Sequence, residues 1–432
     1  MIEVIHSQER DRLAAKLQRI RERNVAFDDE LMSQVAAIIN DVRRRGDSAL
    51  IDYASRFDRC DLTAEDLRVS EKSLRVSAEQ TSANVLSALR ESIRRVRAFH
   101  HFERQQSWEF ENEDGSRLGQ RITPLDAVGL YVPGGTASYP SSVVMNVVPA
   151  QIAGVSRIAV ATPPGTIQKS PAVAAALLEL GVTEVYAAGG AQAIAALAYG
   201  TETIPHVNKI TGPGNKYVAA AKRLVFGAVG IDAIAGLSEV VIVADDSADA
   251  SFVASDLLAQ AEHGEDASAV LVTTSKRVAA EVAAELSHQA PSLPRVRVIE
   301  ASLAQFGAIV VVGDLDEACE LVNDLAPEHV EVVARDQELI ASRIRSAGAI
   351  FFGEQTPVAA GDYVAGPNHV LPTAGAARFS SALGVADFLK RTSLVRFSPA
   401  DIKRSVPLIA ALAEAEGLEG HAASARIRMK DR

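Results

Sequence analysis

The amino-acid sequence predicts an α/β protein built from two incomplete parallel-sheet domains that lie side by side. From residue 157 onward, short apolar segments alternate with segments of helical character, which is the pattern of strand–helix–strand units in a parallel sheet. Glycine-rich turns, at Gly189-Gly190 and Gly212-Pro213-Gly214, stand where a predicted strand passes into a predicted helix. These two observations set the fold class.

The elements follow in chain order. Residues 1–105 carry charges at helical spacing and are expected to be mostly helical. A hairpin-like piece runs from Trp108 through the turn Glu113-Asp114-Gly115 to Arg121, and an apolar strand from Ala127 then breaks into a Pro-Gly-Gly turn. The further predicted strands are 158–162, 184–188, 207–211, 240–244, 269–273, 296–299, 308–312, 330–334 and 347–353. The predicted helices between them are 172–180, 191–199, 216–224, 249–263, 276–287 and 316–325.

We divide the chain into four parts on this basis. Residues 1–25 form an N-terminal helical segment, and residues 26–126 with 239–381 form a first, discontinuous α/β domain. Residues 127–238 form a second, Rossmann-like α/β domain. Residues 382–432 form a helical C-terminal tail, which is expected to dock on something, such as another subunit.

Composition excludes several classes of function. The formal net charge of −11 argues against nucleic acid and anionic membranes as partners. No apolar run approaches the length of a membrane span, and the N-terminus lacks the basic flank and apolar stretch of a signal peptide. The two cysteines, Cys60 and Cys319, make no zinc-ligand spacing, so a reducing cytoplasm is the simplest location.

The stretch from Asp256 to Gly264 is the strongest candidate for chemistry. It has the character of a helix end, and Gln260 and His263, three residues apart, would lie on one helical face with Cβ atoms roughly 5–6 Å apart. That separation suits chelation of a metal ion. The alternative is a polar helix end that faces water.

Three further features carry polar side chains that suit a site. The glycine-rich turns suit a nucleotide phosphate at helix N-termini, although G-x-G-x-x-G is absent and plain packing geometry is the alternative. Glu328 and His329 precede a strand and can supply two proton-transfer groups, or serve as surface or capping residues. The long loop 356–374 holds Asp362, Asn368 and His369.

Taken together, these segments resemble the histidinol dehydrogenase family, from about residue 10 to Arg428. The resemblance is carried by Gly129–Ser142, Thr211–Lys216, Gln260–His263, Ala326–His329, Gly361–Pro372, and Glu416 with His421. One departure is Leu237, where the family usually has Pro before the matched Ser238. Loss of Pro frees φ and restores an N–H, so the turn that holds Ser238 is expected to be looser.

The resemblance implies a site made of residues from distant segments. It places the zinc ligands at Gln260, His263, Asp362 and His421, and proton transfer at Glu328 and His329. It places substrate contacts at Ser238, Gln260, His263, Glu328, Asp362, Glu416 and His421, and NAD contacts at Tyr131, Gln192 and Asn215. Ligation by oxygen and nitrogen atoms also accommodates Mn²⁺ or Co²⁺.

The activity that the resemblance implies is a zinc-dependent, NAD-linked, four-electron oxidation of L-histidinol to L-histidine through bound L-histidinaldehyde. It also implies a homodimer in which the tail with His421 completes the partner subunit's site. Two alternatives remain at this point. One is a dehydrogenase of the same fold that acts on another polar alcohol, and the other is a zinc protein without redox function, either a hydrolase or a binding protein.

Overall fold

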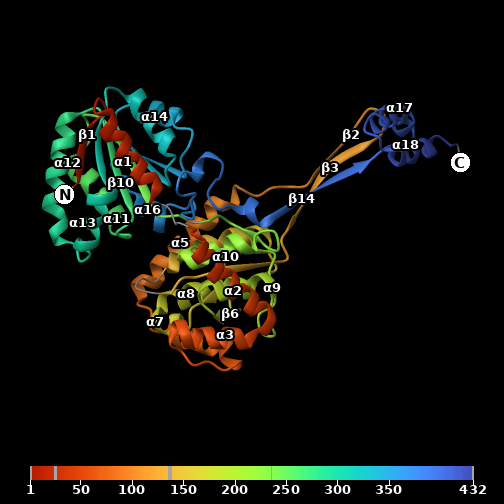
Figure 1. Ribbon diagram of the computed structural model, residues 1–432, viewed down its shortest axis with the longest axis horizontal. Helices are drawn as coiled ribbons and strands as arrows, with labels where there is room; N and C mark the ends of the chain where they lie inside the picture. The colour runs from red at the N-terminus through yellow and green to blue at the C-terminus, as the bar shows by residue number, and fades with distance from the viewer. Residues whose placement is uncertain (1, 24–26, 135–138, 235, 431–432) are drawn as a thin grey trace.

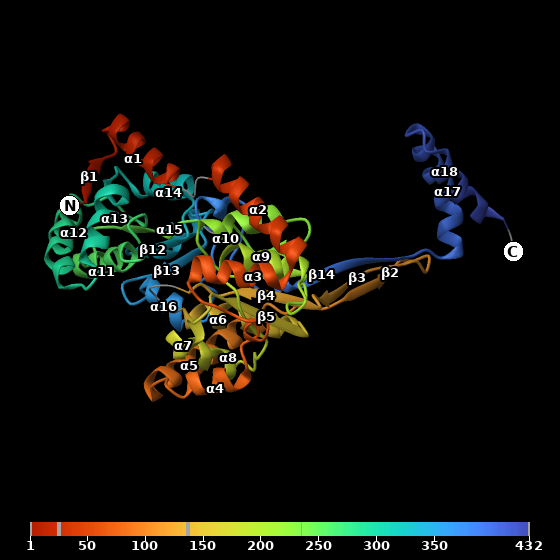
Figure 2. The ribbon, with the colours of Figure 1, turned by 60° about the horizontal axis from the view of Figure 1, so that its bottom comes forward.

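The computed structural model describes residues 2–23, 27–134, 139–234 and 236–430, which form two α/β lobes and a projecting arm (Figure 1 and Figure 2). The first lobe holds a six-stranded parallel sheet in the order β1-β11-β10-β9-β12-β13. The second holds a five-stranded parallel sheet in the order β6-β5-β4-β7-β8. The predicted pair of parallel-sheet units is therefore confirmed.

The strands of the six-stranded sheet are apolar because helices cover both of its faces. Val240, Ile242 and Ala244 of β9 pack towards α11–α13, and Val241 and Val243 pack towards α1, α14 and α15. The strands are β1 (Glu3–His6), β9 (Glu239–Ala244), β10 (Ser268–Thr273), β11 (Ala308–Val311), β12 (His329–Val333) and β13 (Ala349–Phe352). The helices are α1 (Arg10–Glu22), α11 (Ala250–Ala261), α12 (Lys276–Gln289), α13 (Val296–Phe306), α14 (Leu315–Leu325), α15 (Gln337–Arg343) and α16 (Val358–Tyr363).

Two predictions about this sheet were wrong. The predicted strand at residues 296–299 is the first turn of α13, whose buried residues Ile299, Ser302 and Leu303 follow helical spacing. A short apolar run does not by itself distinguish strand from helix. The sixth strand is instead β1, at the start of the segment predicted to be helical, and it pairs with β11 at the edge of the sheet.

The five-stranded sheet is likewise covered on both faces. Its strands are β4 (Ala127–Tyr131), β5 (Arg157–Thr162), β6 (Val185–Ala187), β7 (Lys209–Thr211) and β8 (Gly230–Ile231). The helices that follow these strands are α6 (Pro140–Ala153), α7 (Thr166–Lys169), α8 (Pro171–Glu179), α9 (Gly190–Tyr199) and α10 (Lys216–Val225).

The N-terminal helices also belong to this second lobe, which corrects the predicted grouping of residues 26–126 with residues 239–381. These helices are α2 (Asp29–Arg45), α3 (Asp47–Tyr53), α4 (Glu71–Ala78) and α5 (Ala83–His101). Val35 of α2 shares a buried cluster with Ile194 of α9, and Val96 of α5 shares one with Val147 of α6. The apolar faces of these helices thus complete the core around the five-stranded sheet.

The arm is a three-stranded antiparallel ribbon that leaves the second lobe and ends in two helices, and these helices lie far from both sheets in both views (Figure 1 and Figure 2). It consists of β2 (Trp108–Glu111), β3 (Arg117–Pro124), β14 (Leu389–Arg396), α17 (Pro399–Ala415) and α18 (Glu419–Arg426). The predicted hairpin is confirmed as β2–β3. The predicted helical tail, residues 382–432, is wrong at β14, whose largely exposed and charged residues give no strand pattern. Within the described residues, no helix is long and apolar enough to cross a bilayer.

Candidate functional site

The candidate catalytic side chains gather at the amino edge of the six-stranded sheet. Ser238 directly precedes β9, Glu328 directly precedes β12, and His329 is the first residue of β12. Because β9 and β12 are neighbouring parallel strands, their first residues lie side by side. Helix α11 runs back towards this edge, so Gln260, in its last turn, reaches the same place.

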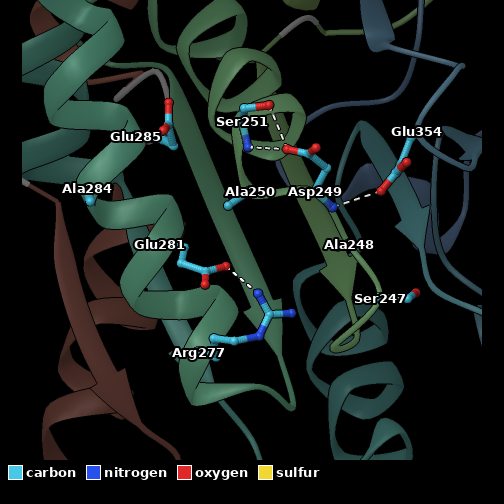
Figure 3. A pocket seen from close by; sticks show the side chains of 10 residues that line it. All are labelled: Ser247, Ala248, Asp249, Ala250, Ser251, Arg277, Glu281, Ala284, Glu285 and Glu354. Atoms are coloured by element: carbon cyan, nitrogen blue, oxygen red, sulfur yellow. Dashed lines mark hydrogen bonds and ion pairs between the residues drawn. The ribbon is translucent and has the colours of Figure 1, made fainter.

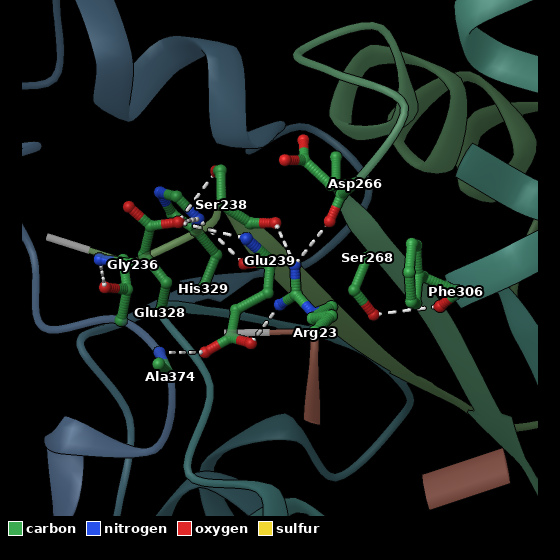
Figure 4. Close-up of polar contacts among 12 residues, drawn as sticks. Arg23, Gly236, Ser238, Glu239, Asp266, Ser268, Phe306, Glu328, His329 and Ala374 are labelled. Carbon is green, nitrogen blue, oxygen red and sulfur yellow. Dashed lines mark hydrogen bonds and ion pairs between the residues drawn. The ribbon is translucent and has the colours of Figure 1, made fainter. Parts of the chain in front are cut away.

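A chain of hydrogen bonds joins three of these residues. Nε2 of Gln260 donates to Oγ of Ser238 at 2.8 Å. The Ser238 hydroxyl donates to Oε2 of Glu328 at 2.7 Å (Figure 4). The backbone N–H of Glu239 donates to the same Glu328 oxygen at 3.1 Å. The Gly236 N–H donates a hydrogen bond to Oγ1 of Thr373. This bond restrains the turn before Ser238, in which Leu237 lies.

The geometry fixes the tautomer of His329. Its Nδ1 lies 3.1 Å from the carbonyl oxygen of Glu239. A carbonyl can only accept a hydrogen bond, so Nδ1 carries the proton and Nε2 of the neutral ring keeps a lone pair. The ring is buried at 4% exposure, packs beside Phe351, and its Nδ1 lies 3.5 Å from Oε2 of Glu328. This arrangement suits a general base.

Asp362 and His369 border the same region. Asp362 lies in the last turn of α16, a short helix within the predicted long loop, and Nδ1 of His369 lies 3.0 Å from the Asp362 carbonyl oxygen. Burial lowers the pKa of His369, while the charges of Asp362 and Glu328 oppose this shift. The sequence pointed to the loop but assigned no role to this partly buried histidine.

This loop also joins the two lobes. The Ser92 hydroxyl of α5 donates to the Tyr363 carbonyl oxygen at 2.6 Å. Nδ2 of Asn368 donates to the Met145 carbonyl oxygen of α6, also at 2.6 Å. Both partners belong to the second lobe, so the site lies where the two lobes meet.

Two predicted site residues, Glu416 and His421, are not brought to this cluster. Glu416 directly follows α17 and His421 lies in α18, the helices at the end of the arm, and both residues are exposed (Figure 2). His263 lies two residues beyond the end of α11, where its N–H donates to the Gln260 carbonyl oxygen at 3.2 Å, and it is exposed. In the part of the chain that the structure describes, no group of three or more His, Cys, Asp or Glu side chains could hold a metal ion.

The donors that are present nevertheless suit a metal bound by oxygen and nitrogen. Because Nε2 of Gln260 is engaged by Ser238, Oε1 is the atom left for a cation. Asp362 adds a half-buried carboxylate and His263 an exposed imidazole. Such a set belongs to an open site rather than a closed structural one.

The predicted NAD contacts lie at the carboxyl edge of the five-stranded sheet. Tyr131 ends β4, and its hydroxyl oxygen accepts a hydrogen bond from the Gly190 N–H at 3.0 Å. Gln192 is buried in the first turn of α9, whose N-cap residue, Gly189, has no side chain to cap the N–H groups that follow Gly190. N–H groups at the start of a helix suit a phosphate. Residues 135–138 of the motif Gly129–Ser142 lie outside the described residues.

Asn215 is held in a second turn at this edge. Its Oδ1 caps α10 by accepting from the N–H groups of Tyr217 and Val218, which leaves Nδ2 for a ligand. The buried ion pair of Lys222 and Asp232 holds this turn in place. Nζ of Lys222 donates to the Gly212 carbonyl oxygen at 2.8 Å, and the Asp232 carboxylate accepts from the Gly212 N–H at 2.8 Å. A Cβ at Gly212 would lie 2.2 Å from the Tyr131 carbonyl oxygen, so packing alone requires glycine here.

A surface groove of about 610 Å³ lies at the opposite end of α11 and is separate from this site (Figure 3). Its charged side chains are already paired. Arg277 bonds to Glu281, Asp249 caps its own helix through the Ser251 N–H, and Glu354 accepts from the Asp249 N–H.

Two buried charged residues that sequence analysis missed also contact the site. Glu239 bonds through its backbone to both Glu328 and His329, and its carboxylate pairs with Arg23 (Figure 4). Arg23 stands in the sequence as one of several arginines in a charged helical segment, and no local pattern marks it.

Comparison with known proteins gives a consistent result. A family model described as histidinol dehydrogenase matches residues 21–429. The chain is 51% identical to a histidinol dehydrogenase of Geobacillus kaustophilus, over 93% of this chain and 95% of that protein. It is 52% identical to one from Gluconobacter oxydans, over 92% of each chain. A crystal structure of histidinol dehydrogenase from Elizabethkingia anophelis superposes with a TM-score of 0.92 at 33% identity, covering 99% of this chain and 98% of that one.

Proposed function

The chain belongs to the histidinol dehydrogenase family, and from this premise we propose how its own residues carry out the reaction. It is an oxidoreductase of histidine biosynthesis that acts on the CH–OH group of histidinol. In the proposed reaction, L-histidinol is oxidised to bound L-histidinaldehyde and then to L-histidine, and two NAD are consumed. A hydrolase or a binding protein without redox function does not fit this family.

The observation that carries the proposal is the fixed tautomer of His329. Its Nε2 keeps a lone pair, so it can take the proton of the substrate hydroxyl as the carbon-bound hydrogen leaves as hydride and the C=O bond forms. The Glu239 carbonyl then stabilises the charged ring through Nδ1. The buried position of His329 limits the access of water to this step.

Glu328 is assigned to the second half of the reaction. The acid contains one more oxygen atom than the aldehyde, so water must add to the carbonyl carbon before the second hydride can leave. Oε2 of Glu328 is held by Ser238 and by the Glu239 N–H, so Oε1 is the oxygen that would take a proton from that water. Once its first proton has passed to solvent, His329 accepts the hydroxyl proton of the hydrate during the second oxidation. Retention of the aldehyde protects it from side reactions.

The zinc ligands are proposed to be Gln260, His263, Asp362 and His421 of the partner subunit. When bound, zinc would fix the imidazole and amine of the substrate as a template. Substrate contacts are proposed from Ser238, Gln260, His263, Glu328 and Asp362, with Glu416 and His421 from the partner's arm. The exposed tip of the arm supports this sharing, because those two residues lie far from the cluster of their own subunit.

NAD is proposed to bind through Tyr131, Gln192 and Asn215, with its phosphates near the uncapped N-terminus of α9. When bound, NAD accepts one hydride in each oxidation.

The test is the yield of NADH from a limiting, known amount of L-histidinol, with purified protein, Zn²⁺ and excess NAD. Two NADH per histidinol, abolished by a chelator and restored by Zn²⁺, are expected. One NADH per histidinol would mean that the aldehyde escapes and that Glu328 has another role. No NADH from folded, zinc-loaded protein would contradict the proposed reaction.

A further inference from the structure

Arg23 is a buried cation just beyond the end of α1, with 2% of its side chain exposed. Its guanidinium bonds to the Glu239 carboxylate. One nitrogen also donates to two backbone carbonyl oxygens, that of Ser238 at 3.2 Å and that of Asp266 at 2.8 Å (Figure 4). Asp266 follows His263 in the turn after α11. Arg23 therefore holds the segment of Ser238 and the turn of His263 at once.

Glu239 contacts two further parts of the site, the end of the loop 356–374 and the catalytic pair Glu328 and His329. Its Oε1 accepts a hydrogen bond from the Ala374 N–H at 2.9 Å, which ties the end of the loop that carries Asp362 and His369. Its backbone N–H and carbonyl bind Glu328 and His329. Burial raises the pKa of Glu239, whereas the charge of Arg23 opposes that shift.

We propose that Arg23 and Glu239 are a positioning pair for the chemical step, which hold the Ser238–Glu239 backbone where it orients Glu328 and His329. The inference rests on the proposed function, because it assigns a role to residues that act through that catalytic pair. Neither side chain touches the reacting atoms. Loss of the pair would displace the Glu239 carbonyl and N–H, and a displacement on the order of 1 Å at a base can cost about a hundredfold in rate.

The pair must be altered without leaving a buried charge unpaired, since removal of one partner strongly destabilises a buried ion pair. The double variant Arg23→Met/Glu239→Gln removes both charges, and the Gln amide oxygen can still accept from the Ala374 N–H. It also removes the bonds to the Ser238 and Asp266 carbonyls. A pair with a structural role alone would leave the reaction rate of a folded double variant unchanged.

The experiment measures the single-turnover rate of NADH formation, the KM values for histidinol and NAD, zinc content and Tm. For the double variant we expect a Tm near that of the wild type, full zinc content, KM values within about threefold, and a rate at least about fivefold lower. A smaller decrease in rate, or a decrease that is explained by lost zinc, overturns the proposal.

If the double variant does not fold, the single variant Arg23→Lys tests the proposal instead. Lysine keeps the charge but lacks the planar fork that reaches a carboxylate and two carbonyls, so an intermediate rate is expected. A wild-type rate in Arg23→Lys overturns the proposal.

The matched control is Arg21→Met. Arg21 lies in the last turn of α1, and its replacement removes only an exposed ion pair with Asp324, so the rate, the KM values and the Tm should stay unchanged. His329→Asn is measured alongside, because its failure to slow turnover would contradict the proposed function independently of Arg23.

Discussion

Asp256 on α11 and Glu331 on β12 place two carboxyl groups next to each other beside the candidate site, and each influences the pKa of the other. Two neighbouring carboxyl groups away from water repel each other when both are charged, so the pair favours holding a proton. Glu331 is 2% exposed, and its Oε1 accepts from the N–H of Val358, the first residue of α16, at 3.0 Å. The pair therefore joins α11, β12 and α16, the elements that carry Gln260, His329 and Asp362.

This pair predicts a pH-dependent stability. Burial, and then the charge of Asp256, raise the pKa of Glu331 to about 8 from an ordinary value of 4.5. Between these values the folded protein keeps a proton that the unfolded chain has lost, so stability falls as pH rises through this window. Glu331→Gln should thus gain stability relative to the wild type between pH 5 and pH 8, by at least about 1.4 kcal/mol, the equivalent of one pKa unit.

The measurement is urea unfolding of both proteins at the two pH values. Glu320→Gln, an exposed position on α14, is the control and should show no such difference. Equal stability differences at both pH values would show that the pair does not hold its proton in the folded state.

His329→Asn should slow both oxidations by about 10²–10⁴-fold, because it removes the base while it keeps a small polar side chain. The zinc content should be unchanged. Both phases of NADH formation are followed by stopped flow, with His288→Asn as the control, since His288 is exposed on α12. A rate within a few-fold of the wild type would exclude His329 as the base.

Glu328→Gln should separate the two oxidations. The Gln amide oxygen can still accept from Ser238 and the Glu239 N–H, so the geometry is retained while the base is lost. The first NADH should form at close to the wild-type rate and the second should be delayed strongly. Two NADH formed at wild-type rates would show that water is activated by another group.

The sequence predicted most of the two sheets because their strands are apolar and buried on both faces, and because two strands of the five-stranded sheet are followed by glycine-rich turns. It failed where that signal is absent. The exposed, charged strand β14 has no apolar pattern, and the apolar run at residues 296–299 fits a helix as well as a strand. The amphipathic faces of α2–α5 show that these helices are buried on one side, but not against which sheet.

The same limit applies to the site. Gln260, Glu328 and His329 stand in short motifs whose residue types suit their chemistry, so they could be singled out. Arg23 reaches Glu239 across 216 positions of the chain, and no local pattern encodes such a contact. The arm residues Glu416 and His421 were predicted through family resemblance alone, and within one subunit they remain apart from the cluster.

Tyr131→Phe should weaken NAD binding and leave histidinol binding unchanged. Burial raises the pKa of Tyr131 to about 12, so the hydroxyl stays protonated, accepts from the Gly190 N–H and keeps a hydrogen to donate. A loss of about tenfold in NAD affinity is expected for one hydrogen bond. NAD affinity is measured by titration calorimetry, with Tyr199→Phe at the other end of α9 as the control. Equal NAD affinity in the wild type and Tyr131→Phe would remove Tyr131 from the NAD site.

The shared site predicts complementation between two inactive variants. His329→Asn damages the body of a subunit, and His421→Asn damages its arm. If the arm completes the partner's site, a hybrid dimer has one site with both defects and one site with neither. After unfolding and refolding as an equal mixture, about a quarter of all sites should be intact, since half of the dimers are hybrids and each has one good site.

The measurement is the specific activity of the refolded mixture, compared with refolded wild type. Each variant refolded alone is the control and should stay inactive. A mixture as inactive as its components, from dimers in which differently tagged subunits are shown to co-purify, would mean that His421 serves the site of its own chain. The arm would then have to fold back across the distance that separates α18 from β12 (Figure 2).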